Sequence, residues 1–289
     1  MKAYVERARL VHPYINAATD ERYEDALKDA KKVDEFLASG TKSEDEIARE
    51  TPLLGVPFTC KEAIGVKGMR QNSGLVRYKD HIAEEDSDTA ALYRKAGGIP
   101  VTVTNVPELC MWWESANHVG GLTKSPFDTT RTVGGSSGGE GAIITSAGAL
   151  IGIGNDIAGS IRIPSSFCGI YGHKPTKGVI SNFGDFPFSQ MEPDVETERS
   201  SLYFQPHVSG PGDLPLLMKF CRTTTKTAVD LQCEASTHDH TSPQTSGLRY
   251  ESTILMTGHI SGKAYRKSLK LLSKTGAAYL MHPALSLER

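Results

Sequence analysis

The stretch GGSSGGEGAIITSAGALIGIGNDIAGSIRIPSSFCG, residues 134–169, decides how this chain folds. Two turns rich in glycine and serine, residues 134–139 and 156–160, lie on either side of an apolar run of small residues. Glycines beside a serine let the backbone adopt positive φ and leave N–H groups uncovered for a developing oxyanion. A single glycine–serine stretch is typical of a linker, but the apolar runs exclude a linker here. We therefore predict that Ser160 is a nucleophile with its own oxyanion hole.

The composition is that of a globular protein with a real core. The 289 residues are 38% hydrophobic, and this length allows one large domain or two small ones. The formal net charge of −2 gives no reason to expect nucleic acid or an anionic membrane as a partner. Five cysteines without close pairing favour reduced thiols and a cytoplasmic setting. The longest apolar run, residues 143–153, is too short to span a membrane, and no signal peptide follows Met1.

The first fifty residues predict two helices and a connector. Residues Tyr4 to Leu10 suggest a short helix that stops before Pro13. Apolar residues then recur at helical spacing from Tyr23 to Leu37, with Gly40 as the stop, so we expect an amphipathic helix that packs on something larger. The charged stretch from Lys42 to Glu50 is interpreted as a solvated connector without a function.

The next hundred residues alternate between strand and helix patterns. The strands expected are residues 55–63, which lead into Lys61 and Glu62, residues 99–106 and residues 149–154. The helices expected are residues 87–96, capped by Ser87 and closed by two glycines, and one helix after each of Ser137 and Ser160. Strand, helix and strand in this order predict a parallel sheet with covering helices.

The pattern weakens after Gly178. Residues 194–209 and 223–246 have no period of helix or strand, and only residues 214–220 and 264–272 suggest helices. A metal site at residues 238–240, His-Asp-His, is less favoured than a polar loop, because no partner ligands stand at metal-site spacing. We therefore divide the chain into a core, residues 1–200, and an incomplete or divergent remainder of the same domain, residues 201–289.

Other chemistries fit the two turns less well. A phosphate-binding loop needs a lysine at the end of its glycine run, where this chain has Glu140. A G-x-S-x-G elbow is absent around Ser160, since Ile161 and Arg162 follow it. A Ser-His-Asp triad is conceivable among the nine histidines, but no histidine stands in a motif that marks it as the base. What remains is a serine activated by a second serine and a lysine.

Residues 134–178 resemble the signature of the amidase signature family of serine hydrolases, and within it the fatty-acid amide hydrolases, particularly the second type found in animals. The resemblance implies an α/β fold with a central mixed sheet covered by helices on both faces, and a C-terminal part shorter than the family's. It places the catalytic set on Lys61, Ser136 and Ser160, with a cis peptide before Ser136. The spacing between the serines, 160 − 136 = 24, resembles the family's and selects Ser136 over Ser137 as the bridging serine.

The resemblance also implies the surroundings of the nucleophile. The oxyanion hole would be formed by the backbone N–H groups of Ile157, Ala158, Gly159 and Ser160. Ala158 departs from close relatives, which carry glycine, and it fits only if its φ is negative. Ser137, Asp156 and Arg162 are expected to support the site, and structural roles are favoured about as much as catalytic ones.

The chemistry implied is that of a lysine base. A free lysine amine has a pKa near ~10.4 and is almost fully protonated at neutral pH. Lys61 should therefore be buried and hydrogen-bonded to serine hydroxyls so that it can act unprotonated. It would take a proton from Ser136, which takes one from Ser160, and the relay would return a proton to the leaving amine.

Three functions follow from the resemblance. The first is a serine amidase that cleaves small lipophilic amides, with Met111, Trp112 and Trp113 as a wall for an acyl chain; ordinary core packing is equally favoured for these three residues. The second is a glutamine-hydrolysing amidotransferase subunit, and the third is a non-catalytic protein that keeps the motifs. No cofactor or metal is expected, and the sequence leaves peripheral membrane association and homodimer formation open.

Overall fold

A four-stranded mixed sheet forms the centre of the fold in the computed structural model, which describes residues 1–174 and 180–187 and the backbone of residues 253–255. Its strand order is β1 (Ala18–Glu21), β3 (Ile99–Thr104), β2 (Pro57–Lys61) and β6 (Ile151–Ile153). β2 is parallel to both β3 and β6, which confirms the predicted parallel strands. β1 is an antiparallel edge strand that the sequence analysis missed, since its four residues are too short to show a period. The helices, loop and metal alternative considered beyond residue 194 lie outside the described residues.

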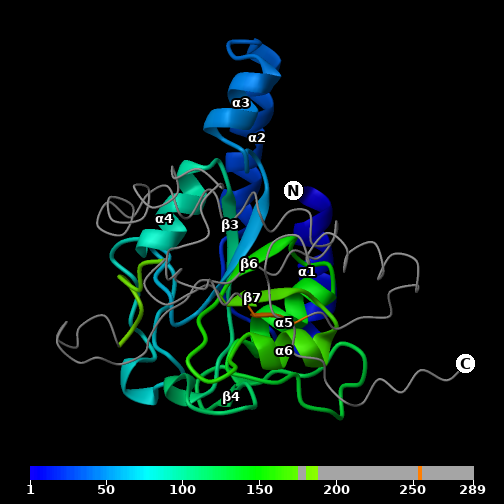
Figure 1. The fold of residues 1–289 in the computed structure, drawn as a ribbon, viewed down its shortest axis with the longest axis vertical. Helices are drawn as coiled ribbons and strands as arrows, with labels where there is room; N and C mark the ends of the chain where they lie inside the picture. The colour runs from blue at the N-terminus through cyan, green and yellow to red at the C-terminus, as the bar shows by residue number, and fades with distance from the viewer. Residues whose placement is uncertain (175–179, 188–252, 256–289) are drawn as a thin grey trace, which may run out of the picture.

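Helices cover both faces of this sheet (Figure 1). One face carries α4 (Asp88–Lys95), whose buried Tyr93 packs against Phe58 of β2. The other face carries three helices: α1 (Lys2–Ile15), α5 (Gly138–Thr145) and α6 (Arg162–Cys168). The buried residues accordingly form two clusters, one on each side of the sheet. The predicted α/β fold class with helices on both faces is therefore confirmed.

The first helix does not stop before Pro13, as the sequence analysis expected. α1 runs through this proline to Ile15 and ends at Asn16, whose φ is 47° and whose N–H donates to the His12 carbonyl. Pro13 lies in the last turn of the helix, where the missing N–H removes one hydrogen bond near an end that frays in any case. Val11 and Ile15, which flank it, are buried and hold this turn against the core.

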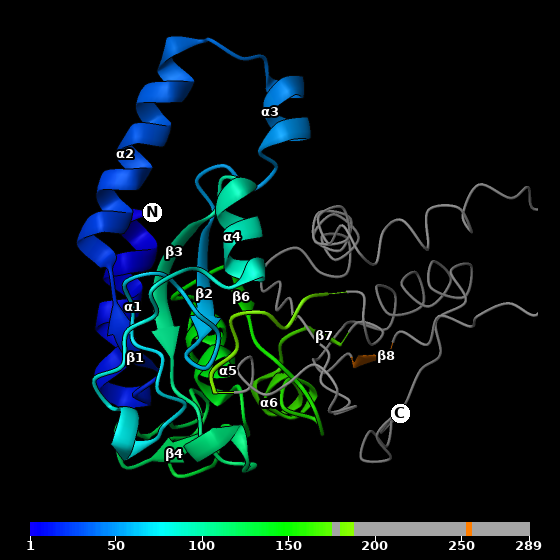
Figure 2. The same ribbon diagram turned by 90° about the vertical axis from the view of Figure 1, so that its left-hand side faces the viewer.

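The second and third helices project from the body of the protein (Figures 1 and 2). α2 (Tyr23–Ser39) ends at Gly40 as predicted, and its first part packs on the core as expected, through buried Tyr23 and Ala26 and partly buried Leu27, Ala30 and Val33. Its last part projects from the body (Figure 2). The predicted connector from Lys42 to Glu50 is wrong, because α3 (Glu44–Glu50) forms there. Its signal is a capping box between Ser43 and Glu46, the S-x-x-E pattern that begins many helices.

The remaining elements are short. They are the 3₁₀ turns η1 (Val76–Tyr78) and η2 (Glu108–Cys110), the hairpin of β4 (Ala116–Asn117) with β5 (Gly121–Leu122), and the antiparallel pair β7 (Gly172–Lys174) and β8 (Thr253–Leu255). Residues 1–174 and 180–187 include no helix that is both long and apolar enough to cross a bilayer.

The sheet brings the functional segments to one edge. Cys60 of β2 is in register with Ile153 of β6, so Lys61 and the turn that follows β6 leave the sheet side by side. Lys61 is also in register with Thr104 of β3. Parallel strands present their carboxyl ends at one edge, which is where α/β proteins build their sites.

Candidate active site

Lys61 and Ser136 are in direct contact in the interior. Lys61 is the last residue of β2, and its side chain is fully buried. Its Nζ donates to Ser136 Oγ at 2.6 Å, and Ser136 is also fully buried. A buried lysine is rare unless it has partners, so this contact favours a chemical role over the snorkelling surface lysine that ends many strands.

The two serine turns are joined by the backbone. The Ser137 N–H donates to the Ser160 carbonyl at 3.0 Å, which links the start of α5 to the turn before α6. The Gly135–Ser136 peptide is cis, as the family resemblance implied. Ser115 holds the first turn: its hydroxyl lies 3.1 Å from the Gly134 carbonyl and accepts from the Gly138 N–H at 2.9 Å. The structure therefore joins the two turns that carry Ser136 and Ser160, and it brings Ser136 into contact with Lys61.

Ser160 lies at the partly exposed end of this arrangement. Its hydroxyl has no hydrogen-bond partner among residues 1–174 and 180–187. A nucleophile must be reached by its substrate, and a half-exposed, unbonded hydroxyl meets that condition. Ser136 is fully buried, which suits a residue that passes a proton rather than one that attacks.

Three of the four predicted oxyanion donors make no hydrogen bond within the described part of the chain. The N–H groups of Ile157, Ala158 and Ser160 donate to no acceptor within the described part of the chain. The Gly159 N–H instead donates to the Asp156 carboxylate at 2.6 Å. Ala158 is not among the residues with positive φ, so the condition set for this departure is met. Gly159 has φ 120°, a conformation that an L side chain rarely adopts.

Asp156 and Arg162 form the frame of the second turn. The Arg162 Nε and Nη2 donate to the two Asp156 oxygens at 2.9 and 2.8 Å. Burial alone would raise the pKa of Asp156, but the hydrogen bonds from Arg162 and from the Gly159 N–H hold it below its usual value. A bidentate pair of this kind fixes geometry as well as charge. Both residues thus shape the turn that carries Ser160.

Two residues at the lysine escaped the sequence analysis. Asn155 Oδ1 accepts from Lys61 Nζ at 2.6 Å, and Asn155 Nδ2 donates to Asp185 Oδ2 at 3.0 Å. Asn155 directly precedes the Asp156 turn, so its position in the chain was a usable signal. Asp185 lies thirty residues further on in a segment with no recognisable period, and no sequence signal connects it to Lys61. Cys110 is another neighbour: burial raises the pKa of its thiol, and the nearby Lys61 opposes that rise.

A buried carboxyl lies beneath the site. Glu140 of α5 is 1% exposed, and its two oxygens accept from the Thr59 hydroxyl at 2.5 Å and the Thr104 hydroxyl at 2.7 Å. Burial raises the pKa of Glu140 to about 8, although the two threonines and the charge of Lys61 lower it. The carboxyl is therefore largely protonated near neutral pH, so the interior next to Lys61 holds a neutral acid.

This carboxyl predicts a pH-dependent stability. Between 4.5, the ordinary pKa of a glutamate, and about 8, Glu140 keeps its proton in the folded protein and loses it in the unfolded chain. The folded state then binds more protons, so stability is full below this window and falls as pH rises through it. A tenfold difference in proton affinity between the two states is worth about 1.4 kcal/mol, so we expect a loss of a few kcal/mol at most. Glu140→Gln, which mimics the protonated acid, should flatten the fall of the urea midpoint between pH 5 and pH 8.

The exposed Glu84→Gln is the matched control and should keep the wild-type slope. Some slope should remain in Glu140→Gln, because burial also raises the pKa of Glu62 to about 7. An unchanged slope in Glu140→Gln would show that the carboxyl is ionised in the folded protein.

The predicted acyl wall lies at the surface. Met111, Trp112 and Trp113 follow η2 and are 68%, 67% and 75% exposed. Core packing within the described residues is therefore excluded for them. Their backbone adjoins the first serine turn, since a Cβ on Gly135 would lie 2.6 Å from the Trp112 carbonyl. The three side chains thus form an apolar surface next to the turn that carries Ser136.

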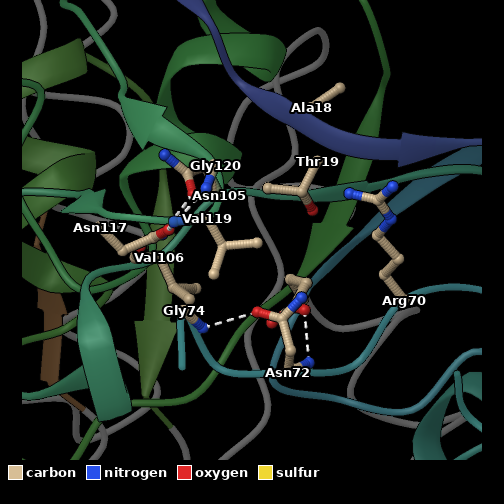
Figure 3. A pocket seen from close by; sticks show the side chains of 11 residues that line it. Ala18, Thr19, Arg70, Asn72, Gly74, Asn105, Val106, Asn117, Val119 and Gly120 are labelled. Carbon is tan, nitrogen blue, oxygen red and sulfur yellow. Dashed lines mark hydrogen bonds between the residues drawn. The ribbon is translucent and has the colours of Figure 1, made fainter. Parts of the chain in front are cut away.

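A separate polar cavity lies beside Glu62, the residue that follows Lys61 (Figure 3). It has a volume of about 180 Å³, and its lining includes Glu62, Arg70, Asn72, Asn105 and Asn117. Lys61, Ser136 and Ser160 are not part of the lining. Both Glu62 oxygens already accept backbone N–H groups, from Asn72 and Ser73. The cavity is therefore distinct from the place where the Lys61–Ser136 pair meets the Ser160 turn.

Comparison with known proteins gives one consistent result. A family model described as Amidase matches residues 1–195. Fatty-acid amide hydrolase 2-A of Danio rerio is 48% identical over 187 residues, which are 65% of this chain and 35% of that protein. Fatty-acid amide hydrolase 2 of Homo sapiens is 46% identical over 189 residues, which are 65% of this chain and 36% of that protein.

The structural comparison covers more of the chain. A solved structure of fatty acid amide hydrolase superposes with a TM-score of 0.68 at 26% identity, over 98% of this chain and 49% of that one. The chain spans about a third of the length of the curated relatives that it matches.

Proposed function

Because this chain belongs to the amidase family, we propose that it hydrolyses the C–N bond of amides with Ser160 as nucleophile and Lys61 as base. The observation that carries the proposal is the 2.6 Å contact between Lys61 Nζ and Ser136 Oγ, in a buried site joined by backbone to the Ser160 turn. Acyl transfer needs an accessible nucleophile, a base and donors for an oxyanion. Ser160 is partly exposed, and the N–H groups of Ile157, Ala158 and Ser160 are available as donors. Lys61 lies within hydrogen-bond reach of Ser136, through which it would act on Ser160.

The proposed reaction begins with a proton relay. Unprotonated Lys61 takes the proton of Ser136, and Ser136 takes the proton of Ser160 as its oxygen attacks the amide carbonyl carbon. The negative charge that develops on the carbonyl oxygen is met by the free N–H groups of Ile157, Ala158 and Ser160. The relay then returns a proton to the nitrogen as the C–N bond breaks, because an amine leaves poorly without one. Water releases the acyl group from Ser160 by the same steps.

The first test identifies the nucleophile. A fluorophosphonate reacts with an activated serine, so mass spectrometry of the labelled full chain should place the adduct on Ser160. Ser160→Ala should abolish labelling, whereas the half-exposed Ser166→Ala should leave it unchanged. An adduct on Ser136, or persistent labelling of Ser160→Ala, would contradict the assignment.

We further propose that the substrates are lipophilic amides. The exposed apolar surface of Met111, Trp112 and Trp113 supports this, as do the fatty-acid amide hydrolases among the relatives. Each methylene that such a surface removes from water is worth roughly 0.8 kcal/mol, or about a fourfold gain in affinity. An acyl chain laid along the surface would gain from several methylenes at once.

The substrate proposal predicts a dependence on acyl length. The value of kcat/KM should rise from acetamide to long-chain primary amides and ethanolamides, and Trp113→Ala should weaken this rise because it removes the largest apolar contact. The exposed Phe127→Ala tests whether any exposed aromatic has the same effect, and it should leave the rise intact. If kcat/KM of the wild type did not depend on acyl length, the protein would be a general amidase without a preference for lipophilic substrates. A preference for glutamine would favour the amidotransferase alternative.

A further inference from the structure

Lys61 is held on two sides, by Ser136 and by Asn155. Besides the contact with Ser136 Oγ, Lys61 Nζ donates to Asn155 Oδ1 at 2.6 Å and approaches the Asn155 carbonyl at 3.4 Å. An unprotonated amine has two N–H bonds and one lone pair. If the two Asn155 oxygens accept the N–H bonds, the lone pair is left for the Ser136 hydroxyl. The same three partners can accept the three N–H bonds of the protonated form, so the amine gains and loses a proton without moving.

This arrangement works only if the amide of Asn155 presents its oxygen to the lysine. An asparagine side chain has an acceptor at one end and a donor at the other, and a rotation of 180° exchanges them. The reversed amide would place its NH₂ group against Lys61, where it would compete for the lone pair that must face Ser136. Something must therefore fix the orientation of the Asn155 amide.

Asp185 supplies that constraint. Its Oδ2 accepts from Asn155 Nδ2 at 3.0 Å, and an ionised carboxylate has no hydrogen to donate to the amide oxygen. The reversed amide would set oxygen against oxygen. The carboxylate thus selects the orientation in which the Asn155 oxygen faces Lys61.

The position of Asp185 is itself fixed by the residues that follow β2. Asp185 forms a bridge with Ile64, and its neighbours on both sides are bonded to the same segment. The Gly65 N–H donates to the Gly184 carbonyl at 3.0 Å, and the Phe186 N–H donates to the Ala63 carbonyl at 2.7 Å. The strand that ends in Lys61 therefore also anchors the carboxylate that acts on it through Asn155.

We propose that Asn155 is a positioning residue that orients the Lys61 amine toward Ser136, and that Asp185 fixes the orientation of the Asn155 amide. This inference rests on the proposed function for its catalytic meaning, but its geometry does not depend on any substrate. Asn155 and Asp185 do not touch the amide substrate in this scheme, so the binding of substrate should not need them.

The experiment compares the full-length wild type with Asn155→Ala, Asp185→Asn and the half-exposed control Asp128→Asn. Asn155→Ala should lower kcat by about 10- to 100-fold, the range that a hydrogen bond to a charged group is worth, with KM unchanged. Asp185→Asn should cause a smaller fall in kcat, because an asparagine at 185 can donate or accept and so allows both orientations of Asn155. Asp128→Asn should match the wild type. A wild-type kcat in Asn155→Ala would overturn the proposal.

NMR spectroscopy tests the geometry around Asn155 without a measurement of enzyme activity. The side-chain amide signal of Asn155, identified in ¹⁵N-labelled protein by its loss in Asn155→Ala, should shift or split in Asp185→Asn and also move in Lys61→Met. An Asn155 signal that is unchanged in either Asp185→Asn or Lys61→Met would overturn the proposal. If the wild type hydrolyses no amide and takes no fluorophosphonate label, the proposed function fails, and this signal alone decides whether Asp185 and Lys61 hold Asn155. If Asn155→Ala does not fold, the near-isosteric Asn155→Asp identifies the signal by its loss, and Asp185→Asn then gives both measurements.

Discussion

Lys61→Ala is expected to lower amide turnover by at least about 10²- to 10⁴-fold, the usual contribution of a positioned general base. The side chain it removes contacts both Ser136 and Asn155. Without it, no group within hydrogen-bond reach of Ser136 can take its proton among residues 1–174 and 180–187. The measurement is kcat/KM on an amide together with the rate of fluorophosphonate labelling of Ser160, and both should fall.

Lys67→Ala is the matched control, since Lys67 is an exposed lysine six residues further on and should be replaceable without effect. Lys61→Met, which nearly keeps the volume of the buried side chain, separates loss of the base from loss of packing. An active Lys61→Met would remove Lys61 from the mechanism.

Gly139→Ala is expected to destabilise the protein by about 3 kcal/mol or more, at the upper end for overpacking in a core. A Cβ at this position would lie 2.4 Å from the Asn105 nitrogen and 2.7 Å from its carbonyl oxygen. Both are backbone atoms that cannot rotate away, and the Gly139 N–H donates to the same carbonyl. Helix α5 would have to move off the end of β3. Urea unfolding of the whole chain measures the loss.

Gly141→Ala provides the comparison within the same helix. Its Cβ would meet the Cys168 sulfur at 3.1 Å and the Pro164 Cβ at 3.2 Å, and no backbone atom closer than 3.4 Å. Alanine also gains about 1 kcal/mol in helix propensity over glycine, so the net change should be small. Equal losses in the two variants would show that the glycines serve the helix in general and not its approach to β3.

The sequence predicted well the parts of the fold that rest on local chemistry. The turns around Ser136 and Ser160, the strand that ends in Lys61 and the helix capped by Ser87 all have signals within a few residues. The predictions were wrong where an element is stabilised by contacts with residues distant in the sequence. α1 passes through Pro13 because buried Val11 and Ile15 hold the turn, and burial cannot be read from one segment. β1 is a strand because it pairs with the edge of β3, which is distant in the sequence.

The candidate site was predictable to the same degree. Lys61, Ser136 and Ser160 belong to motifs, and the structure brings Lys61 and Ser136 into contact and joins the Ser160 turn to Ser137. Asp185 belongs to no motif, and its relation to Lys61 arises only when residues 184–186 pair with residues 63–65. Sequence spacing also could not show that Gly159 gives its N–H to Asp156, since that depends on the conformation of a five-residue turn.

The projection of α2 and α3 from the body has a practical consequence for engineering. The link between these helices contains Gly40, around which a Cβ would meet no atom within 4 Å, and the neighbouring Thr41 and Lys42 are exposed. Chain inserted at such a tip alters neither a buried contact nor a strand pairing. An affinity tag or a fused domain between residues 40 and 43 would therefore leave the serine turns and their lysine in place, and it would give a handle for immobilising the protein at a distance from its chemistry.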